Sequence, residues 1–190
     1  MIDFLVDIDT QAFLFLNAQH AQWLDQAMYI FSGRFIWIPL YSLIAWLLIR
    51  KFGWKGGLIA IAAVGLAVTF SDLTCARLIR PAVERLRPAN LENPISAFTH
   101  IVNGYRGGAY GFPSCHATNT FALALCSSLF LKNRVYTILI FSWTIAQCYS
   151  RIYLGVHYPG DLLAGATIGC AYAAILYVLA AHLSKKILRP

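Results

Sequence analysis

"LLAGATIGCAYAAILYVLAAHL", residues 162–183, contains no acidic or basic side chain other than His182 near its end. A helix needs about 20 mostly apolar residues to cross the hydrocarbon core of a bilayer. Residues 162–183 are therefore predicted to form a transmembrane helix.

Four further apolar segments precede this helix in the chain. Hydrophobic residues make up 59% of the 190 residues and charged residues only 12%, and the mean hydropathy is +0.62. These values are typical of polytopic membrane proteins. We predict an all-α, polytopic membrane helix bundle with five transmembrane helices, built as one domain over residues 1–190. The four earlier spans are predicted at residues 28–49, 56–79, 117–131 and 135–149.

The first 27 residues have a different pattern. Apolar residues such as Ile2 and Phe13 are interrupted by acidic residues such as Asp3 and Asp9. We interpret residues 1–27 as an amphipathic helix region at the membrane interface, with a sixth span as the alternative. The stretch has neither the basic start nor the small-residue cleavage site of a secretory signal peptide, so we expect none.

A net charge of +7 and a pI of about 9.3 are compatible with nucleic-acid binding, but the lysines and arginines gather at turns. One group lies between the first two predicted spans, one between the third and fourth, and one after the fifth: Arg50, Lys51, Lys55, Lys132, Arg134, Lys185, Lys186 and Arg189. Alternating spans put these groups on one side of the membrane, which the positive-inside rule makes cytoplasmic. We therefore expect no nucleic-acid partner.

Three stretches on the opposite side of the predicted bundle are rich in chemically reactive residues. They are "RPAVERLRP" (80–88), "FPSCHAT" (112–118) and "YSRIYLGVHYPGDLLAG" (149–165). Several arginines at one membrane depth would repel one another unless an anion lay between them, and the planar guanidinium suits phosphate oxygens. A multiply charged anion is therefore the predicted ligand.

The second and third stretches place two histidines near this anion. Ser114 is expected to be the N-cap of the next helix, whose free backbone N–H groups would form a phosphate seat beside His116. His157 and Asp161 lie four residues apart. At that spacing the carboxylate can accept a hydrogen bond from one imidazole nitrogen, which leaves the other nitrogen available to attack phosphorus.

Each motif also has an ordinary structural explanation. Arginines beside membrane spans most often contact lipid headgroups, and His116 or Asp161 alone could simply begin a helix. The coincidence of an anion seat and two imidazoles on one membrane face favours a functional site. Cysteine-phosphatase chemistry needs an arginine six residues after Cys115, where this chain has Phe121. The carboxylates are scattered, so no metal site is predicted.

The chain has five cysteines and no regular pair of them. Cys126 and Cys170 fall inside apolar spans, where cysteine usually packs as a small hydrophobic residue. Cys75, Cys115 and Cys148 lie closer to the outer ends of the predicted spans. The pattern leaves open whether any two of them pair.

The three stretches resemble, in order and spacing, the signature blocks of the type 2 phosphatidic acid phosphatase family, which shares its site design with vanadium haloperoxidases. The first family block is Lys, six residues, Arg-Pro, and residues 80–88 match it with arginine in place of lysine. The second is Pro-Ser-Gly-His, and residues 113–116 match it with cysteine in place of glycine. The third is Ser-Arg, five residues, His, three residues, Asp, and residues 150–161 match it in full. The three blocks lie within residues 71–165.

This resemblance implies a lipid phosphatase that needs no metal and no cofactor and forms a phosphohistidine. His157, supported by Asp161, would attack phosphorus, while His116 would protonate the leaving oxygen and then activate water. The resemblance also implies a set of phosphate-binding residues: Arg80, Arg87, Ser114, Cys115 and Arg151. Arginine at position 80 keeps the positive charge of the family's lysine, and cysteine at position 115 keeps the backbone N–H of the family's glycine. Both substitutions change the local geometry.

A site at the outer face predicts an amphiphilic substrate whose chain stays in the lipid bilayer. Among the substrates that the resemblance implies, the compact chain with its acidic start favours undecaprenyl diphosphate. The alternatives are phosphatidylglycerol phosphate, phosphatidic acid and lipid A phosphates, or transfer of the phosphate to a second lipid. A transporter or lipid-binding membrane protein is the non-enzymatic alternative. We expect the bacterial cytoplasmic (inner) membrane, with the site facing the periplasm or exterior, and the sequence defines no oligomeric state.

Overall fold

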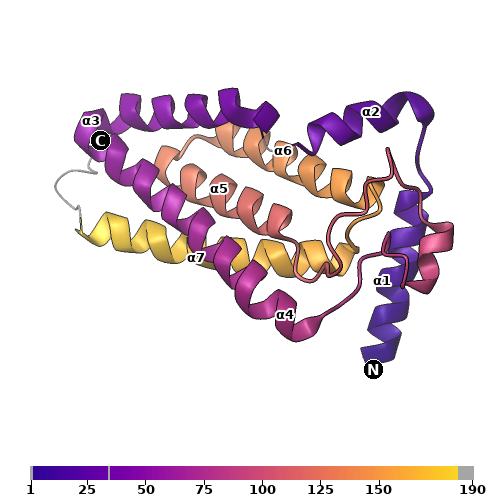
Figure 1. The fold of residues 1–190 in the computed structure, drawn as a ribbon. Coiled ribbons are helices and arrows are strands. Elements are labelled where there is room, and N and C mark those ends of the chain that lie inside the picture. The colour runs from indigo at the N-terminus through magenta and orange to yellow at the C-terminus, as the bar shows by residue number, and fades with distance from the viewer. Residues whose placement is uncertain (1, 34, 184–190) are drawn as a thin grey trace.

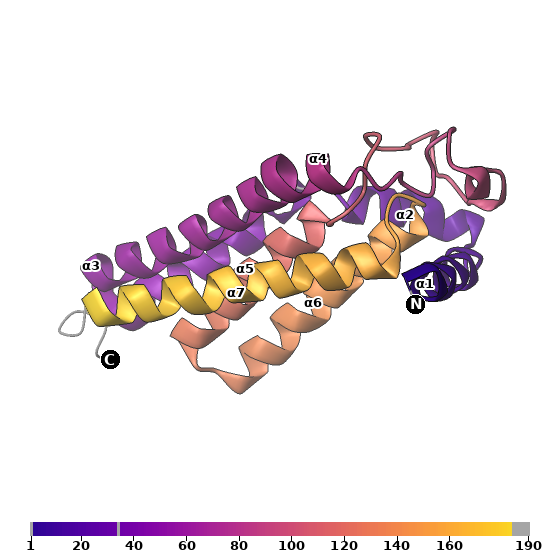
Figure 2. The same ribbon diagram turned by 90° about the horizontal axis from the view of Figure 1, so that it is seen from below.

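A computed structural model describes residues 2–33 and 35–183, and their fold is all-α, as predicted (Figure 1). The helices are α1 (Ile2–Asn17), α2 (Gln22–Phe31), α3 (Ile38–Leu73), α4 (Arg80–Val83), α5 (Cys115–Leu131), α6 (Arg134–Tyr153) and α7 (Pro159–Leu183). Short 3₁₀ turns occur at Phe35–Trp37 and Pro94–Phe98, and a π-helical segment, Thr74–Ile79, joins α3 to α4. Helices α3, α5, α6 and α7 form an elongated bundle (Figures 1 and 2).

The first two predicted spans are the two arms of one bent helix. Helix α3 turns sharply at Gly53, whose φ of 69° lies in a region that glycine adopts without steric cost. The predicted start of the first span at Met28 is wrong, because α2 ends at Phe31 and the chain enters α3 through a 3₁₀ turn. The interfacial region predicted for residues 1–27 is divided in the structure between α1 and the start of α2.

Helix α7 packs directly on α5 through two glycines. A Cβ atom at Gly165 would collide with the backbone oxygen of Ser114, and one at Gly169 would collide with the backbone of Thr118. Small residues at such crossings let two helix backbones approach closely, which is how membrane helices commonly associate. This close packing places the first residues of α5 beside the first residues of α7.

Two helical segments of the described chain have the length and apolar composition needed to cross a membrane, Phe35–Val83 and Pro159–Leu183. The first contains both arms of α3 and therefore two of the predicted spans. Cys115–Leu131 is apolar but shorter. The total of five spans stays a prediction.

Helix α1 lies crosswise over one end of the bundle, as both views show (Figures 1 and 2). Its inner face is fixed by Phe13, which is fully buried against Tyr158, and by Asn17, whose amide donates to the backbone oxygens of Ile152 and Tyr153 at 2.9 and 3.0 Å. Its outer side exposes large apolar side chains: Phe4, Leu5, Ile8 and Phe15. The first helix thus combines a buried inner face with an apolar surface that is available to lipid.

The two ends of the bundle differ in charge and chemistry. At one end, Lys51 beside the α3 bend donates to the backbone oxygen of Leu131 at the end of α5, at 2.5 Å. Lys185, Lys186 and Arg189, which were expected on the same side, lie outside the described residues. The opposite end carries α1 and the long connection of residues 84–114 (Figure 2).

Candidate active site

The three stretches predicted to share one membrane face meet around a cavity of about 750 Å³ at the α1 end of the bundle. Its lining includes residues from all three: Arg80, Arg87, Cys115, His116, Arg151 and His157. Ser114 and Asp161 are adjacent to these lining residues without being part of the lining. The Ser114 N–H donates to the backbone oxygen of Asp161 at 2.9 Å. The structure therefore brings together every residue that the sequence predicted for the site.

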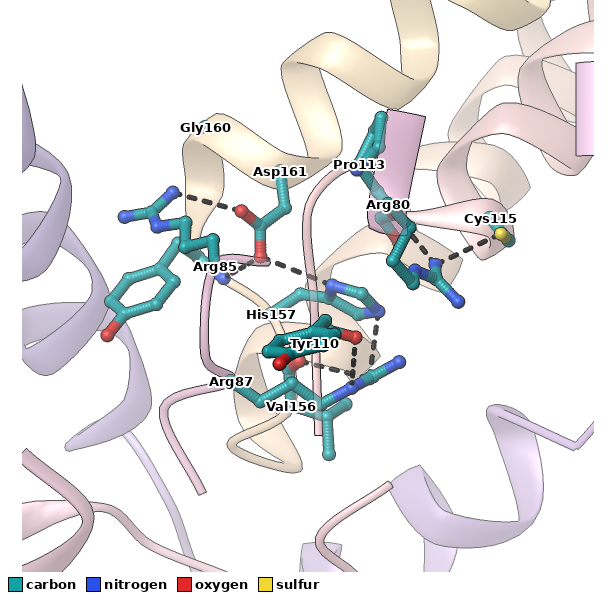
Figure 3. Close-up of polar contacts among 12 residues, drawn as sticks. Arg80, Arg85, Arg87, Tyr110, Pro113, Cys115, Val156, His157, Gly160 and Asp161 are labelled. Carbon is teal, nitrogen blue, oxygen red and sulfur yellow. Dashed lines mark hydrogen bonds and ion pairs between the residues drawn. The ribbon is translucent and has the colours of Figure 1, made fainter. Parts of the chain in front are cut away.

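His157 and Asp161 form a buried pair in the turn between α6 and α7 (Figure 3). His157 Nδ1 lies 3.3 Å from Asp161 Oδ2, and Arg87 Nη1 lies 3.1 Å from His157 Nε2. A guanidinium can only donate, so Nε2 must accept and the ring proton is assigned to Nδ1, facing the carboxylate. The lone pair of Nε2 is thus on the side of the ring that faces Arg87.

The arginines also control the charge of this histidine. Burial of the ring lowers the pKa of His157 well below its ordinary value, and the positive charges of Arg87, Arg151 and Arg80 lower it further. Burial, together with Arg151 and Arg80, lowers the pKa of Arg87 to about 10, so this guanidinium stays charged at neutral pH. A neutral imidazole surrounded by three cations is well suited to an anionic ligand.

Arg85, to which the sequence assigned no role, supports the pair from behind. Its Nη1 lies 2.9 Å from Asp161 Oδ1 and 2.7 Å from Asp9 Oδ2 of α1. The guanidinium carbon lies 3.8 Å from the centre of the Tyr158 ring, and the Tyr158 N–H donates to Asp161 Oδ2 at 3.0 Å. The Asp161 carboxylate is therefore held at both oxygens (Figure 3).

The start of α5 lies where the sequence predicts a phosphate-binding helix start, but the contacts of its N-cap residue differ from those expected. Ser114 occupies the N-cap position, yet its hydroxyl makes no capping hydrogen bond. In the described part of the chain this buried oxygen has no hydrogen-bond partner at all. A buried hydroxyl without a partner is costly, so the side chain is suited to bind a ligand oxygen.

Arg80 and His116 flank this helix start. Arg80 Nη2 donates to the backbone oxygen of Pro113 at 2.8 Å and lies 3.0 Å from Cys115 Sγ. The π-helical segment ends directly before Arg80, and such irregular turns are frequent at functional sites. His116 Nε2 lies 3.3 Å from the backbone oxygen of Ser32.

Arg151 is held by two residues that lie outside the three sequence blocks. Its Nη1 donates to the hydroxyl of Ser32, in the connection between α2 and α3, and its Nη2 donates to the Tyr105 hydroxyl at 3.1 Å. Neither partner belongs to a signature block or carries a local sequence signal. Only the packing of distant segments brings them to Arg151.

The cavity continues from the arginines into the bundle. A polar pair lies in this deeper part, where the Asn119 amide donates to Asp72 Oδ1 at 2.8 Å. The Asn119 side-chain oxygen is buried and has no hydrogen-bond partner among the described residues. Apolar and aromatic side chains complete this region: Tyr41, Val64, Val68, Leu123 and Trp143. The cavity therefore has a cationic end and a mixed interior, in which apolar side chains surround the Asp72–Asn119 pair and a few further polar side chains.

An all-α bundle that has two segments long and apolar enough to cross a membrane, and a cationic cavity beside a buried histidine, fits a membrane protein that binds an anion. Residues 56–184 match the PAP2 superfamily, and the chain belongs to this family of lipid phosphatases. The resemblance seen in the three sequence blocks is thereby confirmed, and the non-enzymatic alternative is not supported.

Three curated relatives show the range of activities near this chain. It is 46% identical to a lipid A 4'-phosphatase of Bacteroides thetaiotaomicron, over 98% of this chain and 83% of that protein. It is 32% identical to a lipid A 4'-phosphatase of Porphyromonas gingivalis, over 93% of this chain and 74% of that protein. It is 28% identical to an undecaprenyl-diphosphatase of Sulfolobus acidocaldarius, over 86% of this chain and 74% of that protein.

The fold is similar to a crystal structure of a transmembrane PAP2-type phosphatidylglycerolphosphate phosphatase from Bacillus subtilis. The TM-score is 0.67 at 19% identity, and the match covers 96% of this chain and 87% of that one. At this identity the likeness concerns the fold alone.

Proposed function

We propose that the protein hydrolyses the 4'-phosphate ester of lipid A at the outer face of the cytoplasmic membrane, through a phosphohistidine on His157. The observation that carries the proposal is the polarity of the His157 ring. Its Nδ1 faces Asp161 at 3.3 Å, while its Nε2 lies at the cationic cavity, 3.1 Å from Arg87. This is the arrangement that a neutral nitrogen nucleophile requires.

In the first half of the reaction, the lone pair of His157 Nε2 forms a bond to phosphorus as the bond to the lipid oxygen breaks. His116 donates a proton to that oxygen, so the lipid leaves as an alcohol. The positive charge that develops on the His157 ring is stabilised by Asp161. Arg87 shifts from Nε2 to the incoming phosphate oxygens.

In the second half, His116 accepts a proton from a water molecule that attacks the phosphohistidine. The N–P bond breaks, inorganic phosphate leaves and the electron pair returns to Nε2. Charge on the nonbridging oxygens is balanced by the guanidinium groups and by the donors at the start of α5: Arg80, Arg87, Arg151, Ser114 and the Cys115 N–H. Preorganised donors of this kind supply the largest part of the rate enhancement in many enzymes. We propose that they make a metal ion unnecessary.

The substrate assignment is supported by the relatives and by the cavity. Two relatives with high coverage are lipid A 4'-phosphatases. Lipid A carries its phosphate on an acylated glucosamine, so hydroxyl and amide donors lie near the phosphate. The unpartnered oxygen of Asn119, beside Asp72, offers an acceptor for such a donor in the cavity that contains the arginines.

Undecaprenyl diphosphate, the substrate favoured by sequence alone, is supported less well. Its chain is a hydrocarbon from the diphosphate onward, and it has no donor to offer to Asn119. A buried polar group without a partner weakens binding of a ligand that leaves it unsatisfied. An undecaprenyl-diphosphatase is still among the relatives, so this lipid is the second candidate.

The orientation in the membrane is proposed from charge. Lys51 and the turn with Lys132 and Arg134 lie at the end of the bundle opposite the cavity. Basic turns of transmembrane proteins are retained in the cytoplasm. The cavity would then open toward the periplasm, where α1 could rest with Phe4 and Phe15 against the lipid interface.

The proposal is tested by phosphate release from purified full-length protein. Four lipids are compared at equal surface concentration: lipid A, undecaprenyl diphosphate, phosphatidylglycerol phosphate and phosphatidic acid. We expect the highest kcat/KM with lipid A, a product whose mass has decreased by one phosphate at the 4'-position, and no loss of rate in EDTA. Preference for another lipid would refute the substrate assignment, and appearance of the phosphate on a second lipid would indicate a phosphotransferase.

The phosphohistidine intermediate is tested separately. Protein is mixed with ³²P-labelled lipid A and quenched in alkaline SDS, and the label bound to the protein is measured before and after acid treatment, which releases phosphate from histidine. Wild type quenched during turnover should carry label on His157. His116→Ala should slow both formation and hydrolysis of the phosphohistidine, whereas His157→Ala should carry no label and release no phosphate. Phosphate release by His157→Ala would refute the assignment of the nucleophile.

A further inference from the structure

Two thiols from distant parts of the chain meet at the edge of the candidate active site. Cys75 Sγ lies 3.0 Å from Cys115 Sγ, although 40 positions separate the residues in sequence. Cys75 lies in the π-helical segment and is fully buried, and Cys115 is the first residue of α5 and lines the cavity. Both residues are free thiols in the structure, and the Cys115 thiol donates to Cys75 Sγ at a separation shorter than an ordinary non-bonded contact of two sulfur atoms.

The surroundings of the pair belong to the phosphate seat. Cys75 Sγ donates to the backbone oxygen of Pro113 at 3.2 Å, and Arg80 Nη2 contacts that same oxygen and Cys115 Sγ. Cys115 also occupies the position where the second family block has glycine. A bond between the sulfurs would therefore join the segment that carries Arg80 to the segment that carries Ser114 and His116.

We propose that Cys75 and Cys115 form a disulfide in the mature protein and that this bond braces the phosphate seat. The inference rests on the outward orientation proposed above, because disulfides persist in the oxidising periplasm and are rare in the cytosol. It does not depend on which lipid is the substrate.

The bond forms by thiol–disulfide exchange with a disulfide donor of the periplasm. The Cys115 thiolate, which borders the cavity, attacks one sulfur of the donor, and the donor's other sulfur leaves as a thiolate. The Cys75 thiolate then attacks the Cys115 sulfur of the mixed disulfide and releases the second donor sulfur. The protein loses two thiol protons and two electrons, and the donor disulfide is reduced to two thiols.

A disulfide between Cys75 and Cys115 has two physical consequences. It closes a long loop, residues 75–115, and so removes conformational freedom from the unfolded chain, which stabilises the folded state. It also fixes the distance between the Arg80 segment and the first turn of α5. Reduction should therefore lower thermal stability and weaken binding of an anion at the seat.

The direct test uses wild-type protein expressed in a bacterium with an intact periplasmic oxidation system. Cells are quenched in acid, and free thiols are alkylated in SDS with a light maleimide. Proteins are then reduced and the released thiols labelled with a heavy maleimide. We expect the heavy label on Cys75 and Cys115 and the light label on Cys126 and Cys170. Light label on Cys75 and Cys115 would overturn the proposal, even if the phosphatase assay succeeded.

The effect of the disulfide on thermal stability and on anion binding is tested by reduction of purified protein. Dithiothreitol should lower the unfolding temperature of wild type by about 5 °C. It should also weaken competitive inhibition by inorganic phosphate at least about threefold, the change expected when anion donors lose their fixed geometry. Cys75→Ser should show neither response, whereas Cys170→Ser in α7 should respond as wild type does. An equal response of Cys75→Ser and wild type, or no response of wild type, would refute the brace.

Discussion

Arg85 Nη1 lies 2.9 Å from Asp161 Oδ1, although 76 positions separate these residues in sequence. Asp161 is fully buried, and an unpaired buried carboxylate would be strongly destabilising. Arg85 is held in turn by Asp9 of α1 at 2.7 Å. The helix that lies across the end of the bundle thus contributes, through one arginine, to the position of the carboxylate beside His157.

The first prediction concerns this arginine. Arg85→Ala should lower kcat about tenfold or more, because misplacement of the Asp161–His157 pair is costly, with a smaller change in KM. Arg85→Lys keeps a positive charge near Asp161 and should recover part of kcat. Asp9→Asn removes only the outer ion pair and should have a smaller effect. Steady-state kinetics with purified variants measure all three, and an unchanged kcat for Arg85→Ala would show that Asp161 does not need this partner.

The sequence could predict which residues meet at the cavity because they lie in three short blocks whose ends are fixed by helix boundaries. His157 and Asp161 are four positions apart, and α7 begins between them at Pro159, so local spacing already predicts their contact. Ser114 could be placed at the start of α5 because it lies just ahead of the predicted apolar span at residues 117–131. Because successive predicted spans cross the membrane in opposite directions, all three blocks are predicted on the same side of it.

Other parts of the site could not be predicted, because they depend on packing between distant segments. Ser32 reaches Arg151 only because α2 ends beside α6, and no motif marks that serine. The basic residues around Gly53 predict a turn between two spans, whereas in the structure the helix continues through a bend at this glycine. Hydropathy reports how apolar a segment is, but it does not report whether the helix continues through a bend.

The second prediction concerns pH. Burial lowers the pKa of His157 well below 6.5, and the charges of Arg87, Arg151 and Arg80 lower it further. A nucleophile must be neutral, so His157 should stay active as pH falls through 6.5 and should lose activity only when its lowered pKa is reached. We expect the acid limb of kcat/KM that belongs to the enzyme to lie well below pH 6.5.

The substrate phosphate also ionises near neutral pH, so its contribution must be separated. A lipid phosphorothioate, whose second ionisation occurs at lower pH, provides the control. The acid limb of the phosphorothioate should report His157 alone. An acid limb at or above 6.5 with this analogue would contradict the lowered pKa.

The third prediction uses two glycines of the long connection. A Cβ atom at Gly111 would lie 3.0 Å from Asp161 Oδ2 and 3.6 Å from His157 Nδ1, whereas one at Gly108 would meet no atom within 4 Å. Gly111→Ala should therefore displace the buried pair and reduce kcat about tenfold or more, since small misplacements of catalytic groups are costly. Gly108→Ala should stay within about twofold of wild type, as exposed substitutions usually do. Equal kcat values for the two variants would show that space beside Asp161 is not limiting.

The fourth prediction concerns selection between lipids. Asn119 donates to Asp72 at 2.8 Å and keeps a buried oxygen without a partner in the deeper part of the cavity. If that oxygen accepts a hydrogen bond from the sugar or amide of lipid A, Asn119→Leu should reduce kcat/KM for lipid A about tenfold, the value of one hydrogen bond of roughly 1.4 kcal/mol. The same variant should leave kcat/KM for undecaprenyl diphosphate unchanged or raised.

Leu123→Met is the matched control, because it changes an apolar side chain of the same cavity and helix without altering polarity. It should affect both lipids to a similar, small extent, since the two side chains have similar volume. The readout is the ratio of kcat/KM for the two lipids, which cancels any general loss of folded protein. A ratio that Asn119→Leu leaves at the wild-type value would mean that the polar pair has no part in lipid selection, and the preference for lipid A would then have to arise at the arginines.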